Sequence, residues 1–522
     1  MKFKYYKSIW SVASFILMLN MTSCVNDLDV DPTIDKSTTM EFDQEKVFTK
    51  IYASMGLSGQ QGPAGDGDIA DIDEGTSDFF RQMWNMNELP TDEALCNWGD
   101  PGIPEYNHAT WDASHGMITS LYYRLYFGIT MSNFFLQQTE GMTDSNTITE
   151  RAEARFLRAM FYYYAIDFFG NVPFLTTLST ENAPQKSRAE VFSFIETELT
   201  ECMGDMAEPG TNVYGRADQV AAWLLLARLY LNAEVYTGTA QWEKAATWAK
   251  KVMDSNYQLC GTYAQLFMGD NNGNSVNKAN EEIILPILQD GITTQNYGGS
   301  LFLIASTHKD DMPSTGTSEN WAGNKARKQL LDKFFPNSDA PNVDVEAMVT
   351  AAKDDRAMFY GKDRNLSIDD ESVFTDGFSC AKFTNVYANG DTPHDVKFVD
   401  MDIPFMRVAE AYLIYGEANC RLNNPGECKK AIDALRDRAH ASKQPSYSLD
   451  FICDEWAREF AFEGRRRMDL IRFGKFGGSS TYMWEWKGGA KDGTSFSKNK
   501  NVYGIPTKDL NANSNLVQNT GY

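Results

Sequence analysis

The sequence predicts an all-α protein in which tetratricopeptide-like helix pairs form a scaffold and long irregular loops run between them. Three observations support this fold class: helical periodicity over 151–170, two paired amphipathic segments within 221–253 and 405–439, and several long stretches rich in Gly, Asn and Asp. Apolar residues three and four apart indicate amphipathic helices. Loops of this length on a rigid scaffold usually carry function, so we expect the functional residues there.

The segment RAEARFLRAMFYYYAIDFFG at 151–170 is the strongest single helix prediction. Phe156, Met160, Tyr163 and Tyr164 lie three or four residues apart and therefore share one face of a helix. Four large apolar or aromatic side chains on one face indicate a helix that packs against a neighbour along its whole length.

Two further regions each predict a helix, a short turn and a second amphipathic helix. The segments are AAWLLLARLYLNAEVY (221–236) with WEKAATWAKKVM (242–253), and FMRVAEAYLIYGEANCRL (405–422) with CKKAIDALRDRA (428–439). Small and large residues are placed as in tetratricopeptide repeats, at Ala227, Tyr230, Ala245, Ala411, Tyr412 and Ala431. The match is degenerate, so it predicts close helix-pair packing rather than a regular array.

The regions between these units are too polar and too long to be simple connections. They lie at 57–77, 96–112, 268–280, 291–323 and 361–396. We expect these loops to carry the ligand site.

The N-terminus resembles a bacterial lipoprotein signal. Three lysines, at positions 2, 4 and 7, precede an apolar stretch at 9–19 that is too short to span a bilayer. Small residues then lead directly to Cys24, which predicts cleavage before this cysteine and lipidation of it. The alternative is a structural cysteine after an ordinary signal peptide. We divide the chain into a lipoprotein signal peptide at 1–23, a lipidated tether at 24–44 and one domain at 45–522.

The charge of the chain excludes some classes of partner. The formal net charge is −23, and such a surface repels nucleic acid and anionic headgroups. We therefore expect no nucleic-acid partner, and contact with a membrane through the lipid anchor only. Apart from Cys24 the seven cysteines are scattered and form no C-x-x-C pair, which indicates buried thiols rather than a zinc site or a disulfide framework.

Specific blocks of sequence resemble the SusD-like (RagB/SusD) family of Bacteroidetes outer-membrane lipoproteins. The blocks are RAEARFLRAMFYYYAIDFFGNVPF (151–174), DEWAREFAFEGRRRMDLIRFGKF (454–476) and NVYGIPTKDLNANSNLVQNTGY (501–522). The stretch NELPTDEALCNW at 87–98 resembles the starch-binding members in particular. The resemblance covers essentially the whole mature chain.

The resemblance implies a glycan-binding domain at 45–522 and no enzymatic activity. It implies a surface lipoprotein of the outer membrane, facing the cell exterior, that captures starch or malto-oligosaccharides. The glycan would pass to a TonB-dependent SusC-like transporter, with no cofactor required. The absence of G-x-S-x-G, H-E-x-x-H and P-loop motifs agrees with a binding protein. Three alternatives remain: a receptor for another neutral glycan, a surface glycoside hydrolase, and a tetratricopeptide-type adaptor for a protein partner.

The residues that match the contacts of the starch-binding members form an aromatic arc with polar companions. Trp98, Tyr297 and Trp321 would stack on sugar faces, while Asp73 and Arg81 would bind hydroxyl groups. The chain departs from that pattern twice: Cys96 stands where the starch binders have a second tryptophan, and Pro101 where they have asparagine. We expect a missing stacking or packing surface at the first position and a missing polar contact at the second.

Two other motifs have competing interpretations. Oxygen ligands alternate at Asp270, Asn272 and Asn274, with Glu281 at the twelfth position, as in a structural calcium loop. Ser275 and Lys278 depart from that loop, so a polar turn is the alternative. The basic run Arg465–Arg467 is interpreted as ion pairing within the helical scaffold, near Glu459, Glu463 and Asp469, rather than as an anion site.

Overall fold

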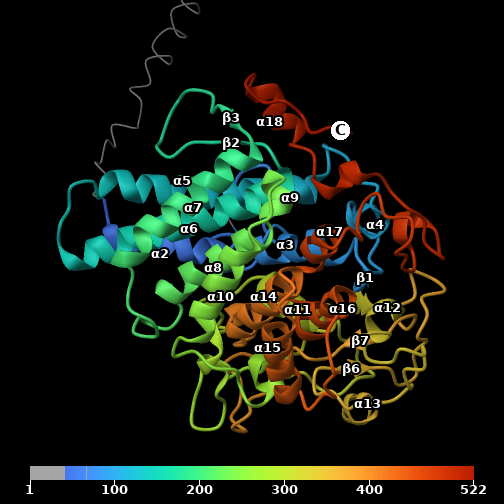
Figure 1. Ribbon diagram of the computed structural model, residues 1–522. Coiled ribbons are helices and arrows are strands. Elements are labelled where there is room, and N and C mark those ends of the chain that lie inside the picture. The colour runs from blue at the N-terminus through green and yellow to red at the C-terminus, as the bar shows by residue number, and fades with distance from the viewer. Residues whose placement is uncertain (1–41, 66) are drawn as a thin grey trace, which may run out of the picture. The chain divides into compact units, whose positions relative to one another are not determined.

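Helices packed in series form the scaffold of the protein, as seen in a computed structural model that describes residues 42–65 and 67–522. Along this series α5 packs on α6, α6 on α7, α7 on α8, α8 on α10, α10 on α14 and α14 on α15. Figure 1 shows α5, α6 and α7 lying side by side, with α8, α10, α14 and α15 continuing the series. The signal peptide, Cys24 and nearly all of the predicted tether lie outside the described residues.

The helices have the following bounds: α2 Gln44–Gly56, α3 Phe79–Glu88, α4 Ile103–His108, α5 Gly116–Gln138, α6 Ser145–Phe169, α7 Arg188–Cys202, α8 Gln219–Leu231, α9 Ala233–Thr237, α10 Trp242–Met253, α11 Gly299–Ser306, α12 Lys328–Leu331, α13 Val345–Ala352, α14 Val408–Arg421, α15 Pro425–Arg438, α16 Leu449–Phe460, α17 Arg466–Arg472 and α18 Thr507–Ala512. Short 3₁₀ turns lie at Met203–Asp205, Tyr263–Phe267, Ala279–Glu281, Lys487–Gly489 and Lys498–Asn501. In the described part, no helix is both long and apolar enough to span a membrane.

The strands of the described residues are short and form antiparallel pairs. They are β1 Ala94–Cys96 with β5 Asn324–Ala326, β2 Val172–Pro173 with β3 Gln185–Lys186, β4 Ile283–Ile287 with β8 Ile403–Arg407, and β6 Phe359–Tyr360 with β7 Ser379–Cys380. The pairs β1–β5 and β4–β8 join segments far apart in the sequence, and β1–β5 is the pair that positions the candidate site.

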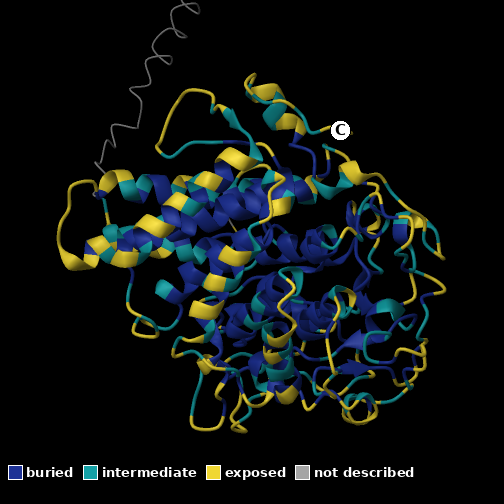
Figure 2. Ribbon diagram, in the orientation of Figure 1, coloured by how far each residue is buried: buried dark blue, intermediate teal, exposed yellow. Residues whose placement is uncertain are grey.

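Local sequence explains where the long helices begin and how closely they pack. The side chain of Asp144 accepts a hydrogen bond from the backbone N–H of Thr147 (2.9 Å) and caps α6. Gly128 lets α5 approach α6, because a Cβ atom there would come within 2.4 Å of the Phe161 ring. Gly416 does the same between α14 and α15, against Ile432. Buried residues gather where the helices pack, and exposed ones lie on loops and outer faces (Figure 2).

The helix predictions are confirmed, and several boundaries are corrected. The helices α6 and α15 begin earlier than predicted, at Ser145 and Pro425. The predicted 405–422 helix begins only at Val408, because the preceding residues of β8 pair with β4, and Pro404 lacks the N–H that a helix interior needs. The predicted 221–236 helix is divided at Asn232 into α8 and α9. The predicted small residues Ala227 and Ala245 are fully buried at the helix contacts.

Two of the predicted loops contain helices. The loop at 96–112 includes α4, and the loop at 291–323 includes α11, whose apolar run Leu301–Ala305 is buried. An uninterrupted apolar run of this length is a signal for a buried element, and the glycine-rich flanks concealed it.

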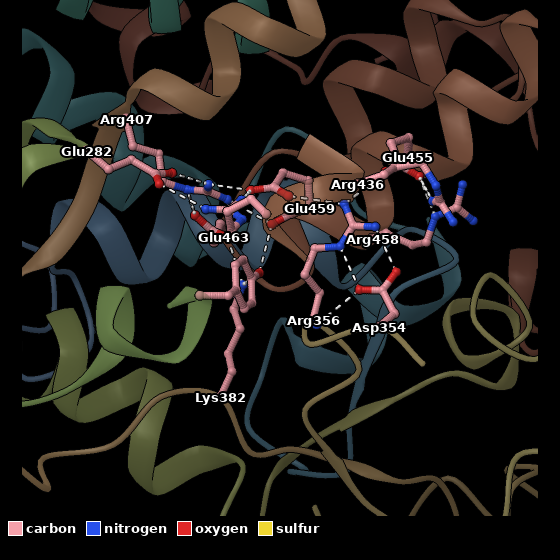
Figure 3. A network of polar contacts seen from close by, with 12 residues as sticks. Glu282, Asp354, Arg356, Lys382, Arg407, Arg436, Glu455, Arg458, Glu459 and Glu463 are labelled. Carbon is pink, nitrogen blue, oxygen red and sulfur yellow. Dashed lines mark hydrogen bonds and ion pairs between the residues drawn. The ribbon is translucent and has the colours of Figure 1, made fainter. Parts of the chain in front are cut away.

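Buried arginines and carboxylates bind the C-terminal helices to the rest of the scaffold, as Figure 3 shows. Glu459 on α16 lies at the centre and pairs with Arg407 (2.7 Å), Arg356 (3.1 Å) and Arg438. Burial raises the pKa of Glu459, but the charges of these three guanidinium groups outweigh burial and hold the pKa below its usual range. The carboxylate is therefore ionised, and three elements converge on it.

The C-terminal arginine run is part of the same kind of network, which confirms ion pairing in the scaffold. The pairs are Arg465 with Glu410 and Asp469, Arg466 with Asp92, and Arg467 with Asp167. All three arginines are buried. Of the expected partners only Asp469 is correct, because Glu459 and Glu463 face other cations, among them Arg407.

Asp402, just before β8, gives the fold a pH dependence. Its carboxylate accepts hydrogen bonds from the Gln289 N–H (2.7 Å) and the Tyr214 hydroxyl (3.0 Å), and burial raises its pKa to about 7. A carboxyl group with a raised folded pKa contributes stability that is present below its unfolded pKa and is lost as pH rises through 7. An asparagine keeps one acceptor oxygen without the charge, and its NH₂ group can donate to the Tyr214 hydroxyl.

We therefore expect Asp402→Asn to gain stability over the wild type as pH rises from 5 to 8. The measurement is the difference in thermal midpoint between variant and wild type at both pH values, with the exposed Asp205→Asn as a control. An equal difference in thermal midpoint at the two pH values would contradict a raised pKa for Asp402.

Candidate functional site

Three predicted aromatic side chains, from separate segments of the chain, meet in one open hollow of about 470 Å³. Trp98 follows β1, Trp321 precedes β5, and Tyr297 precedes α11. Pairing of β1 with β5 aligns Cys96 with Asn324, and the ladder continues through a hydrogen bond from Asn97 N–H to the Gly323 carbonyl (3.0 Å). This register brings the two tryptophans together across more than 200 residues of sequence.

The three rings form a continuous series with tilted planes. The Trp98 and Trp321 centroids are 6.4 Å apart with planes at 54°, and the Tyr297 and Trp321 centroids are 6.2 Å apart at 65°. All three side chains are half-buried, so each is held by the protein and keeps exposed ring surface. The predicted aromatic arc is thus assembled in the structure.

Internal hydrogen bonds use the polar edges of both tryptophans. The Trp98 indole N–H donates to the Trp321 carbonyl (3.1 Å), and the Trp321 indole N–H donates to Glu319 (2.8 Å). Gly323 allows this arrangement, because a Cβ atom there would lie 2.2 Å from the Trp98 ring. The rings are fixed in orientation, and what they offer a ligand is their apolar faces.

Two cations flank the rings. Arg81 on α3 is largely buried; it donates to the Tyr297 carbonyl (2.9 Å), and its guanidinium lies 5.0 Å from the Phe302 ring centroid. Burial lowers the pKa of Arg81, and its Nε atom has no hydrogen-bond partner among the described residues. Lys397 lies 3.2 Å from the Tyr297 hydroxyl, a contact that raises the pKa of the lysine.

Sequence reasoning missed Lys397, Glu319, Asp100 and Thr76 as parts of this hollow. Lys397 lies one residue beyond the predicted loop 361–396. Nothing in its local sequence indicates that it contacts Tyr297, 100 residues away. Glu319 could have been predicted from the sequence, because it stands two residues before Trp321.

Asp73 is the one predicted glycan-binding residue that does not line the aromatic hollow. It is exposed and lines a neighbouring hollow of about 400 Å³. Its Oδ1 atom accepts hydrogen bonds from the backbone N–H and the hydroxyl of Thr76 (2.8 and 2.7 Å), and Thr76 lines both hollows.

Of the two alternatives expected at Cys96, the structure contradicts a missing stacking surface and agrees with a missing packing surface. Cys96 is 2% exposed within β1, and burial raises the pKa of its thiol to about 12. A larger side chain at this position would pack in the core under the site and would not face a ligand. Pro101 is exposed and lines the neighbouring hollow, so the expected loss of a polar contact there stays a prediction.

The predicted calcium loop is held together by hydrogen bonds. Asp270 accepts from the side chains of Asn274 (2.8 Å) and Asn277 (2.9 Å) and from two backbone N–H groups, while Asn272 and Glu281 are exposed. Among the described residues no group of three or more His, Cys, Asp or Glu side chains is placed to hold a metal ion. The calcium site stays a prediction.

Comparison with known proteins decides the family. A family model described as "SusD family" matches residues 263–522, and one described as "Starch-binding associating with outer membrane" matches residues 27–231. The chain is 44% identical over its whole length to the starch-binding protein SusD of Bacteroides thetaiotaomicron, which it also covers completely. The chain belongs to the SusD family.

More distant proteins resemble this chain in sequence or in fold. SusD-like protein P25 of Formosa agariphila is 27% identical over 67% of this chain and 69% of its own. A laminarin-binding SusD-like protein has a TM-score of 0.65 at 22% identity, covering 92% of this chain and 99% of its own. Surface glycan-binding protein A from Bacteroides thetaiotaomicron, solved with laminarihexaose, has a TM-score of 0.65 at 18% identity, covering 91% and 98%. The SusD-like all-α scaffold is therefore confirmed.

Proposed function

We propose that this protein binds starch and malto-oligosaccharides through the aromatic hollow. The observation that carries the proposal is the series Trp98, Trp321 and Tyr297, three rings with exposed faces and internally bonded edges. Sugar rings present flat C–H faces that stack on aromatic rings, each stack contributing about 1 kcal/mol beyond buried area. The tilt between neighbouring rings suits a curved chain such as α-1,4-glucan. The 44% identity to a starch-binding protein supports this choice of glycan.

The polar groups around the rings suit a neutral, hydroxyl-rich ligand. Lys397 and Arg81 donate hydrogen bonds, and Glu319 and Asp100 accept them. Glu319 is tied to the Trp321 indole and lies 3.8 Å from Lys397, so it positions the ring and its cation. Three of the relatives named above are described as binding proteins, and we propose that this protein likewise binds glycan without cleaving it.

The proposal includes a place in the cell. A match to a family model of starch-binding, outer-membrane-associated proteins supports attachment to the outer membrane. We propose that lipidation of Cys24 holds the protein on the exterior face, and that bound glycan passes to a TonB-dependent SusC-like transporter. The net charge of −23 disfavours anionic ligands and agrees with a neutral glycan as cargo.

Affinity electrophoresis of the mature protein tests the choice of ligand. Gels contain amylopectin, pullulan, laminarin, dextran, xylan or no polysaccharide, and reducing sugar is assayed in parallel. We expect retardation by amylopectin and pullulan, which share α-1,4 linkages, and no sugar release. Retardation by laminarin alone would favour a β-glucan receptor, and release of sugar would favour a hydrolase.

A further inference from the structure

A second hollow adjoins the aromatic hollow and shares a wall with it. Thr76 lines both, and the consecutive residues Asp100 and Pro101 line the aromatic hollow and the second hollow respectively. Two separate stretches of chain, 73–76 and 100–101, thus form a common rim. The second hollow encloses about 400 Å³, a volume similar to that of the first.

The lining of the second hollow is rich in hydroxyl groups and contains no aromatic ring. It is built from the residues before α5 and the first turns of α5, together with Asp71, Asp73 and Lys508. The Thr119 hydroxyl donates to the His115 carbonyl (3.1 Å) and the Ser120 hydroxyl to the Gly116 carbonyl (3.0 Å). Because these hydrogens are used internally, the oxygen lone pairs that remain are hydrogen-bond acceptors.

The charges at the rim complete a set of groups suited to sugar hydroxyls. Oδ1 of Asp73 is occupied by Thr76, and the second carboxylate oxygen of this exposed side chain is available as an acceptor. Lys508 supplies donors and lies 3.8 Å from Asp71 across the hollow, with both side chains mostly exposed. The hollow therefore offers both acceptors and donors, and a sugar hydroxyl can bond to either because it carries one donor and two acceptor lone pairs.

We infer that the second hollow is an extension of the glycan site, occupied by further sugar units of the chain that stacks on the aromatic rings. This inference rests on the proposed function and adds a subsite that recognises chain length through hydrogen bonds. A ligand confined to the aromatic hollow does not reach Asp73 in the second hollow, whereas a chain that crosses Thr76 does.

Gly116 offers a way to fill the second hollow without touching the aromatic one. It is the exposed first residue of α5, and a Cβ atom there meets no atom within 4 Å. Gly426, in the first turn of α15, is equally exposed and equally open, which makes Gly426→Leu a matched control. Both variants add the same side chain to the first turn of a helix.

Titration of the mature protein with maltotriose and maltoheptaose tests the inference. We expect the wild type to bind maltoheptaose more tightly, and Gly116→Leu to weaken maltoheptaose binding by roughly five- to tenfold, the equivalent of one or two hydrogen bonds. Maltotriose binding stays as in the wild type, and Gly426→Leu changes neither affinity. Asp73→Asn does not alter α5, and we expect it also to weaken maltoheptaose binding but not maltotriose binding, by a smaller factor than Gly116→Leu.

Each other result has a definite meaning. Unchanged maltoheptaose binding in both Gly116→Leu and Asp73→Asn would overturn the extension and leave the aromatic site in place. Equal weakening of the two oligosaccharides would overturn a separate subsite. Failure of the wild type to bind either oligosaccharide would overturn the proposed function and the extension with it.

Discussion

Alanine at both Trp98 and Trp321 abolishes retardation by amylopectin, and each single change weakens malto-oligosaccharide binding by about 2 kcal/mol, or roughly thirtyfold. The effect is large because the two rings are neighbours, 6.4 Å apart, and a sugar chain that stacks on one reaches the other. Trp321 gives the cleaner result, since Trp98 also covers Gly323 and contributes to packing. The measurement is isothermal titration with maltoheptaose.

Controls separate loss of stacking from loss of folding. Trp248→Ala removes another half-buried tryptophan, on α10 and outside both hollows, and leaves the affinity unchanged. Trp98→Phe keeps a ring over Gly323 and retains part of the binding. If Trp321→Ala binds as tightly as Trp248→Ala does, the aromatic hollow is not the glycan site.

Glu459→Gln lowers the free energy of unfolding by about 3–5 kcal/mol, because it leaves buried guanidinium groups without their central counter-charge. Arg407, Arg356 and Arg438 all pair with this one carboxylate, which is fully buried. Equilibrium denaturation in urea, with far-UV circular dichroism, measures the change as a lower midpoint at unchanged slope.

An exposed carboxylate provides the comparison. Glu201 pairs with Arg155 at 2.6 Å but is 59% exposed, so Glu201→Gln changes stability by no more than about 0.5 kcal/mol. Equal midpoints for Glu459→Gln and Glu201→Gln would show that the network has no stabilising role at its centre. The aromatic hollow contains neither residue, so glycan binding by folded Glu459→Gln protein is expected to persist.

The scaffold was predictable from sequence because its signals are local. The stripe on 151–170 and the small residues of the two helix pairs specify which faces are buried, and the structure places them so. The predicted helix boundaries were wrong where pairing with a distant strand outweighs the local helical periodicity. Residues 405–407 continue a helical periodicity, yet their backbone groups pair with β4, and nothing near them in the sequence indicates that partner.

The site was predictable only in part, and the physical reason is that its geometry depends on distant segments. Resemblance to a family supplied Trp98, Tyr297 and Trp321, and loop composition supported their exposure. The register of β1 with β5, which brings the tryptophans together, has no signature in either three-residue strand. For the same reason sequence reasoning left stacking and packing open at position 96, where Cys96 is buried.

Because the protein itself uses both indole N–H groups, the two tryptophans have no donor with which to mark one particular sugar unit. A polymer of identical units therefore binds in several equivalent alignments, each displaced by one unit from the next. Such degeneracy lets a bound chain slide along the rings without complete release, which would suit the proposed transfer to a transporter. It also raises the affinity for longer chains, because a longer chain has more equivalent ways to bind. In Gly116→Leu the second hollow is filled, so any remaining increase of affinity with chain length measures this statistical effect alone.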